Sequence, residues 1–352
     1  MAKSRGNDKA TMAEGNYDRG GAPAPAHRFH EIIPQGTNID FMGHAKYIVP
    51  FTTALVVISL IWMFTKGFNW GIDFAGGLEM RVEFTGAAQN TKIADVRKAL
   101  DEMPAEWNLK DLEVSDFVIP GKTVFSIKAK GEARVERAGG DEALHDISSK
   151  VLGHLNAKFG EGTAKIVSTD MVGPRVGASL RRQGTWAVVI AMAFILVYIA
   201  FRFNWKYGQG AVIALAHDVI ITAGMFAVLQ REVNLTTIAA LLTIAGYSNN
   251  DTIVIFDRIR EGRRGKYRNI PLREAINHSI NETLSRTILT SGVTMLVVIA
   301  MLFLGGEILF DFSLAMTVGI VIGTYSSIFI ASPLFVWADE LTTSRRQRRI
   351  AR

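Results

Sequence analysis

The sequence contains no cysteine, so disulfides, thiolate metal sites and a cysteine nucleophile are all excluded. Charged residues are scarce as well, at 20% of the 352 residues against roughly 25% in soluble domains. Hydrophobic residues instead reach 49%, and the mean hydropathy is +0.19. This composition argues against a disordered chain and against a purely soluble globule.

The sequence also lacks the patterns of common enzymes. It has no recognisable nucleophile–base set, no metal-ligand cluster and no nucleotide-binding loop. The glycine-rich segment Gly71–Gly77 is not a phosphate loop, because no Lys-Ser/Thr follows it and no strand is predicted before it. We therefore expect a protein that is not an enzyme and has no metal or cofactor, and we interpret this segment as a turn leading into a strand.

Six apolar segments are long enough, or nearly so, to cross the bilayer core, which takes about 20 residues. They are Tyr47–Thr65, Trp186–Phe203, Ala211–Leu229, Leu235–Phe256, Ile288–Leu304 and Phe312–Trp337. The first begins too far into the chain, and is too long, for a cleaved signal peptide. The alternative, buried helices of a large soluble protein, is much less favoured. We predict a membrane bundle of six helices.

Lysine and arginine are distributed unevenly among the connecting segments. They are frequent before the first span, between spans two and three, between spans four and five, and in the C-terminal tail, whereas the two short loops on the other side hold only Arg231. The positive-inside rule then places both termini in the cytoplasm. The formal net charge of +6 is thus a topology signal, and we reject nucleic acid as a partner.

These spans divide the chain into five parts. A cytoplasmic N-terminal segment at 1–46, of which 1–30 is predicted to be disordered, precedes the first span at 47–66. An extracytoplasmic domain follows at 67–183, then spans two to six at 184–337 and a basic cytoplasmic tail at 338–352. Within the spans, apolar spacing from Pro271 predicts an amphipathic helix at 271–285 on the inner membrane surface, feeding span five.

The extracytoplasmic segment has the pattern of a small α+β domain. Alternating residues predict strands at 78–84, 112–119, 122–128 and 164–172, with a turn at Pro120-Gly121. Helical spacing follows Thr91, and a second helix is predicted to open at Gly139-Gly140. The order β-α-β-β-α-β is that of a ferredoxin-like domain. Its expected role is to bind something or to move as a unit.

Ionisable residues at membrane depth are costly and usually functional. Asp251 lies about 24 Å along the fourth span, and Arg286 stands at the entrance of the antiparallel fifth span. The two therefore fall at comparable depth and could pair. Helical register places the hydroxyls of Tyr247 and Ser248 on either side of Asp251, and Gly246 is expected to let a neighbouring helix approach.

A carboxyl in this setting can act as a proton switch. Burial favours the neutral form and a nearby guanidinium favours the charged form, so small rearrangements could load and unload a proton. The alternatives are a static ion pair, or an interhelical hydrogen-bond cluster formed by Asn249 and Asn250. His217 and Asp218 in the third span are further candidates, although the histidine could simply bond a backbone carbonyl.

Several blocks of the sequence resemble the SecD/SecF family of protein-export membrane proteins, within the resistance-nodulation-division superfamily, and SecF in particular. The blocks are Gly71–Gly77, Ala216–Val219, Gly246–Glu261 and Thr283–Ser291. The resemblance extends over residues 36–338. It implies an unfused subunit rather than a SecD–SecF fusion.

The resemblance implies a function that periodicity does not. SecF-type subunits act with SecD in the bacterial inner membrane and use the proton motive force to promote preprotein translocation and release, with protons as the coupling ion. The implied partners are SecD, the SecYEG channel, YajC, the YidC insertase, emerging preprotein and membrane lipids. Asp251 and Arg286 match the family's proton residues, and Gly71, Asp73, Gly76 and Gly77 its outer-face motif.

Two other functions remain open at this stage. One is a proton-coupled exporter of small molecules or lipids from the same superfamily, which the small outer domain disfavours. The other is a passive scaffold that only steadies the channel.

Overall fold

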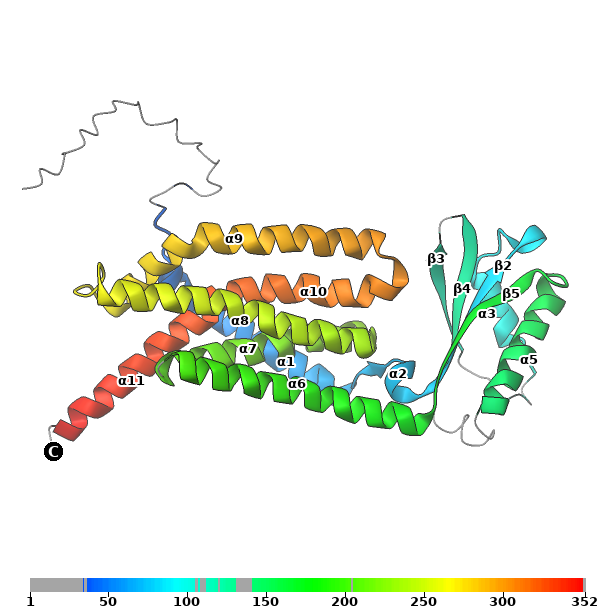
Figure 1. The fold of residues 1–352 in the computed structure, drawn as a ribbon, viewed down its shortest axis with the longest axis horizontal. Coiled ribbons are helices and arrows are strands. Elements are labelled where there is room, and N and C mark those ends of the chain that lie inside the picture. The colour runs from blue at the N-terminus through cyan, green and yellow to red at the C-terminus, as the bar shows by residue number, and fades with distance from the viewer. Residues whose placement is uncertain are drawn as a thin grey trace, which may run out of the picture.

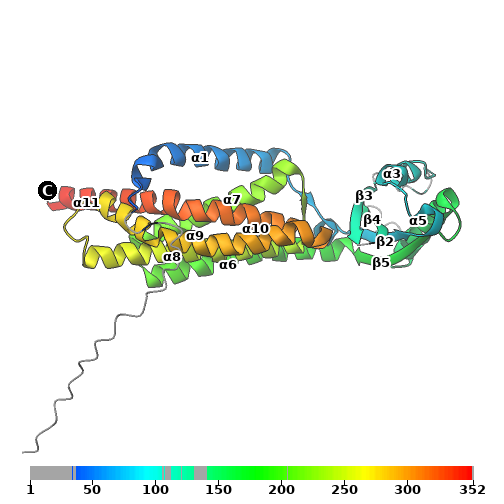
Figure 2. The same ribbon diagram turned by 90° about the horizontal axis from the view of Figure 1, so that it is seen from above.

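The computed structural model describes residues 34, 37–104, 107, 112–119, 121–130, 141–203 and 205–350. Long helices run side by side in a helical bundle, and a sheet domain (residues 77–172) lies beyond one end of it, which we call the sheet end (Figure 1, Figure 2). The predictions made for residues 1–30, for Pro120 and for Gly139-Gly140 fall outside the described residues.

The bundle consists of α1 (Phe41–Thr65), α6 (Pro174–Arg202), α7 (Trp205–Leu229), α8 (Leu235–Arg264), α9 (Leu272–Leu304) and α10 (Gly306–Ser326). A π-helical turn, Ser327–Ala331, joins α10 to α11 (Ser332–Ile350) without a break. Within the described part of the chain, five helices are long and apolar enough to cross a membrane: α1, α6, α7, α9 and the α10–α11 rod. The more polar α8 is equally long but does not meet that standard.

The predicted amphipathic helix at 271–285 is the first half of α9, which continues unbroken to Leu304 and so leads into the fifth apolar segment as expected. Its apolar residues Ala275, Ile276, Ile280 and Leu284 are all buried, and the last three pack in the bundle core with α7, α8 and α11. An apolar stripe therefore marked a buried helix face here, not a membrane-surface one.

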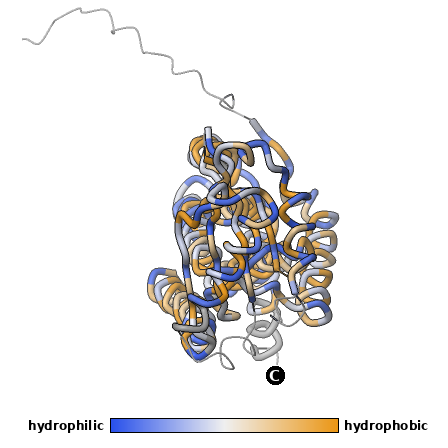
Figure 3. The backbone as a smooth tube through the Cα atoms, turned by 90° about the vertical axis from the view of Figure 1, so that its right-hand side faces the viewer, coloured by the Kyte–Doolittle hydropathy of each residue, from blue (hydrophilic) through white to orange (hydrophobic). Residues whose placement is uncertain are grey.

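The outer surface of the bundle is apolar. Phe64, Phe201 and Leu304 are each more than four-fifths exposed. Hydrophobic residues recur along the helices when the molecule is viewed from the sheet end (Figure 3). Such a surface is unfavourable in water and suits a bilayer.

The sheet domain is built from four antiparallel strands. These are β2 (Gly77–Phe84), β3 (Glu113–Ile119), β4 (Lys122–Lys130) and β5 (Ala164–Val172), in the order β3-β4-β2-β5. The strands expected from the sequence lie within two residues of these bounds. Two helices, α3 (Ile93–Asp101) and α5 (Asp141–Phe159), and a short 3-10 turn (η1, Gly86–Ala88) complete the domain.

One face of the sheet is apolar because strand residues alternate between its two sides. Met80 and Val82 of β2 and Ile127 of β4 are fully buried and pack with Val96 of α3 and Val151 of α5. The other face carries polar side chains and looks toward the bundle across an open cleft, described below.

The connection between bundle and sheet domain is short and paired. After α1 the chain forms β1 (Asn69–Trp70), which pairs in parallel with β6 (Glu232–Val233), the strand just before α8. A single helical turn, α2 (Ile72–Ala75), then leads into β2. The glycine-rich segment thus does follow a strand, contrary to our expectation. β1 is a strand only because it pairs with β6, and the local sequence carries no signal for that pairing.

A buried polar centre in the helical bundle

Asp218 of α7 is the most enclosed carboxyl among the described residues of the bundle, with no exposed surface. Its Oδ2 accepts hydrogen bonds from the hydroxyls of Ser248 on α8 (2.5 Å) and Ser326 on α10 (2.8 Å). Its Oδ1 lies 2.9 Å from Nδ1 of His217. One side chain therefore holds three helices together.

His217 is also buried, and its second ring nitrogen, Nε2, lies 3.3 Å from the hydroxyl of Tyr325 on α10. The histidine and tyrosine rings meet edge to face, with centroids 5.9 Å apart. His217 thus bonds a carboxylate rather than the backbone carbonyl considered as an alternative. It connects Asp218 to a second group on α10.

Asp251 of α8 is a second buried carboxyl, 4% exposed, on a neighbouring face of the same helix as Ser248. Its Oδ2 accepts a hydrogen bond from Ser291 of α9 at 3.3 Å. The Ser291 hydroxyl in turn accepts from Thr324 of α10 at 2.9 Å. A short relay of hydroxyls therefore leads from α10 to Asp251.

The expected ion pair between Asp251 and Arg286 is not formed in this state. Arg286 of α9 is exposed, and its guanidinium has no contact with Asp251 within 4.0 Å. It lies near enough to act on Asp251 electrostatically. Arg286 and Ser291 are five residues apart on α9, so they lie on different faces of this helix.

The residues expected to support Asp251 are also arranged differently. Ser248 donates to Asp218, not to Asp251. The Tyr247 hydroxyl and Oδ1 of Asn249 are buried without a hydrogen-bond partner, and Asn250 is exposed. The amide cluster considered as an alternative is therefore absent from this part of the described structure.

Gly246 does not provide the close helix contact that we expected. A Cβ built there would meet nothing within 4 Å. The close approach to α8 comes instead from α10, where a Cβ on Gly319 would lie 2.4 Å from Ile244 and one on Gly323 would lie 2.8 Å from Ser248. Gly323 thus lets Ser248 sit between α8 and α10 and reach Asp218.

The glycine-rich segment forms a tight joint at the sheet end. Oδ2 of Asp73 accepts a hydrogen bond from the backbone N–H of Leu235 (3.0 Å), the first residue of α8. Gly77 has φ +144°, and a Cβ there would lie 2.3 Å from the carbonyl oxygen of Ala129. Only glycine fits this position, because the strands β2 and β4 approach too closely for a side chain.

Two family models match the chain. The model described as "Protein export membrane protein SecD/SecF, C-terminal" covers residues 151–341, and the "SecD/SecF GG Motif" covers residues 61–88. The chain belongs to the SecD/SecF family. The buried polar centre lies in the first matched region, and the joint around Asp73 and Gly77 lies in the second.

Relatives of this family match nearly the full length of the chain. The protein translocase subunit SecF of Rhodothermus marinus is 39% identical over 331 residues, covering 91% of this chain and 99% of the relative. SecF of Magnetococcus marinus is 43% identical over 88% of this chain and 94% of its own length. The fused SecDF of Thermus thermophilus is 41% identical over 84% of this chain, but only 38% of the fusion is covered.

Solved structures of SecDF are also similar to this chain. The crystal structure of SecDF, described as a translocon-associated membrane protein from Thermus thermophilus, matches with a TM-score of 0.72 and 39% identity. The match covers 87% of this chain and 39% of that one. A second SecDF structure, in a "Super-membrane-facing form", matches with a TM-score of 0.64 and 37% identity. The chain is thus similar to about two fifths of SecDF.

Sequence reasoning missed several members of the polar centre. Ser291, Thr324, Tyr325 and Ser326 bind its carboxyls or histidine, yet none was singled out. The available signal was weak: small hydroxyl residues inside otherwise apolar spans, which also occur where a hydroxyl only bonds its own helix backbone.

Proposed function

We propose that the chain is an accessory subunit of bacterial protein export that acts with SecD and uses the proton motive force to promote preprotein translocation and release. Its relatives are named protein translocase subunits, which supports a transport role over catalysis and over small-molecule or lipid export. The observation that carries proton coupling is the pair of buried carboxyls, Asp218 and Asp251, held by hydroxyl groups inside apolar helices.

The proposed topology has six membrane-crossing helices: α1, α6, α7, α8, α9 and the α10–α11 rod. The short loops at the sheet end contain Arg231 alone among lysines and arginines, while the opposite loops are strongly basic, which supports cytoplasmic termini in the inner membrane. Residues 67–183 are then an extracytoplasmic domain. Its strand order β3-β4-β2-β5 with two helices on one face supports a ferredoxin-like fold.

Asp251 is the proposed proton carrier because both of its protonation states have a partner at hand. The Ser291 hydroxyl donates to the carboxyl here, and a hydroxyl can also accept, so it can turn to bond the neutral carboxyl. A charged carboxylate in an apolar bundle is costly and would attract Arg286, which has no competing ion pair among the described residues. Protonation and release at Asp251 would thereby alternate between two arrangements of α8 and α9.

Asp218 and His217 are a second proposed titrating pair. Asp218 accepts from Ser248 of α8, the helix that also carries Asp251, so this pair on α7 is linked to the helix of the proposed proton carrier. We assign protons as the coupling ion, with no metal or cofactor. An Asp218→Asn variant with unchanged proton flux would limit this pair to a structural role.

SecD is the proposed direct partner, supported by the SecDF fusion among the relatives. Asn250 and Arg286 are exposed on the bundle at membrane depth, where polar side chains facing lipid are costly. Partner helices covering this face of α8 and α9 would remove that cost. The SecYEG channel, YajC, the YidC insertase, emerging preprotein and membrane lipids are further proposed partners, on the strength of the family resemblance.

The test is an Asp251→Asn substitution in the complex with SecD, reconstituted in vesicles. Asp257→Asn is the matched control, since it makes the same chemical change on the same helix at an exposed ion pair with Arg202. We expect Asp251→Asn to abolish proton flux and gradient-dependent preprotein translocation while still co-purifying with SecD. Wild-type translocation by Asp251→Asn would overturn the proton-coupling assignment.

A further inference from the structure

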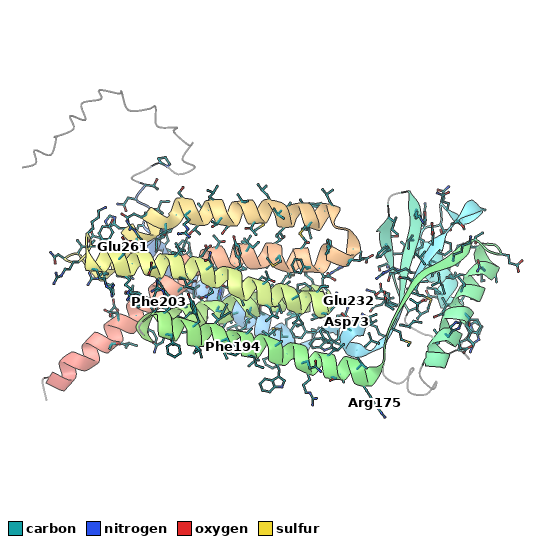
Figure 4. The ribbon with its side chains drawn as sticks, in the orientation of Figure 1. Asp73, Arg175, Phe194, Phe203, Glu232 and Glu261 are labelled. Atoms are coloured by element: carbon teal, nitrogen blue, oxygen red, sulfur yellow. The ribbon has the colours of Figure 1, made fainter. Side chains whose placement is uncertain are left out.

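The start of α8 is bound to the sheet domain by charge. The carboxylate of Glu232, three residues before α8, bridges Nζ of Lys128 and Nζ of Lys130 on β4, each at 2.7 Å. All three side chains are only 17% exposed. Glu232 and Asp73 lie close together at the end of the bundle that faces the sheet, far from Glu261 at the opposite end (Figure 4).

Backbone contacts reinforce this bridge from the other side. The N–H of Gly71 donates to the carbonyl of Val233 (2.9 Å), and β1 pairs with β6. Asp73 accepts from the N–H of Leu235, and Lys130 also donates to the Asn69 side chain at 3.1 Å. Glu232, Val233 and Leu235, at the start of α8 and just before it, are thus fixed to β4 and to the glycine-rich segment.

The same helix carries the proton site. α8 runs without interruption from Leu235 past Ser248 and Asp251 to Arg264. A continuous helix moves as a rod, so a displacement at Asp251 reaches its first turn. The bridge holds the start of α8 to β4 through two short ion pairs at once, so a displacement of α8 is passed to this strand.

The sheet domain also meets the bundle at the start of α10, which packs against β3 and brings Glu307 close to Ser115. A cleft of about 830 Å³ separates the polar face of the sheet, including Arg81 and Phe117, from Ile308 and Asp311 near the start of α10. The cleft therefore lies between two attachments of the sheet domain, the Glu232 bridge beside α8 and the contact with α10. Movement of α8 relative to α10 would widen or narrow this cleft.

We propose that Glu232, Lys128 and Lys130 form a coupling joint that transmits displacement of α8 to the sheet domain and so changes the width of the cleft. These are positioning residues, since none of them touches the proton site. The inference rests on the proposed function for the force that displaces α8. It adds the contacts through which movement of α8 is passed to the sheet domain.

The ion pairs of the joint persist when the carboxyls of the bundle gain or lose protons. Burial disfavours the charged form of Glu232, but Lys128 and Lys130 outweigh it and hold the pKa of this carboxyl down, at about 2. Despite its burial, Lys128 has a raised pKa because it bonds Glu232. Protons gathering outside the membrane would therefore load the carboxyls of the bundle without releasing the joint.

The absence of cysteine makes a direct test possible. Spin labels on Val167→Cys of β5 and Leu304→Cys of α9, both exposed, report the distance between sheet and bundle in the reconstituted complex with SecD. Asp251→Asn mimics the protonated carboxyl and is expected to shift this distance. In a Glu232→Gln background the shift is expected to vanish, whereas Glu102→Gln, which breaks an ion pair inside the sheet domain, is expected to retain it.

Function provides the second readout. Glu232→Gln is expected to lose gradient-dependent translocation while keeping proton flux. The coupling joint would be overturned if Asp251→Asn shifts the label distance equally with Glu232 present and with Glu232→Gln. It would also be overturned if Asp251→Asn abolishes proton flux but leaves the label distance unchanged while Glu232 is intact. Unchanged flux in Asp251→Asn itself would instead overturn the proposed function.

Discussion

Replacing each buried carboxyl by alanine should affect stability very unequally. Asp218→Ala removes the acceptor for Ser248, Ser326 and His217 in a fully buried site. Ser326 can fall back on the carbonyl of Gly323, which it already contacts at 3.2 Å, so two donors are orphaned. At about 1–3 kcal/mol for each orphaned buried donor, the loss is about 4 kcal/mol.

Asp251→Ala should cost much less, because Asp251 has one hydroxyl partner, at the long distance of 3.3 Å. Losing one such bond is worth about 1 kcal/mol. The difference of about 3 kcal/mol corresponds to roughly a hundredfold in the unfolding equilibrium. Reversible unfolding of the two variants in mixed micelles, followed by tryptophan fluorescence, measures it. Equal destabilisation by the two substitutions would refute the conclusion that Asp218, and not Asp251, ties three helices together.

Two further outcomes follow from other contacts. Gly319→Val should lower the free energy of unfolding by about 1–3 kcal/mol, because its Cβ meets the buried Ile244, while Gly246→Ala should change it by less than about 0.5 kcal/mol in the same assay. Glu232 has a pKa of about 2 in the fold against about 4.3 when free, so its contribution is complete above about pH 4.3 and lost as the pH falls toward 2. The destabilisation caused by Glu232→Gln should therefore be the same at pH 7 and at about pH 5; a smaller effect at the lower pH would contradict the charged joint.

The sequence predicted elements with a strong periodic signal. Alternation along Leu78–Phe84 located β2, and long apolar runs located the helices of the bundle. It could not tell which neighbour each face of α8 meets. Ser248 and Asp251 lie within about 60° of each other, yet α7 and α10 pack against the first and α9 against the second.

Glycine positions were ambiguous for a related reason. Gly246 and Gly319 look alike in an apolar span, but only the second faces another helix at close range. The joint at the sheet end was invisible as well, because Glu232 and Lys128 are 104 residues apart and lie in segments with no shared pattern. Contacts of that kind depend on tertiary packing, which periodicity does not encode.

The π-helical turn at Ser327–Ala331 determines how the side chains of α10 are rotated about the helix axis relative to those of α11. Such a turn contains one residue more than an α-turn. Tightening it to α-geometry would rotate α10 against α11 by about 100°, the angle per residue of an α-helix. Ser326, immediately before the turn, would then swing away from Asp218. The hydrogen bond between α7 and α10 therefore depends on one surplus residue, which makes this turn a natural place for the last helix to change its register.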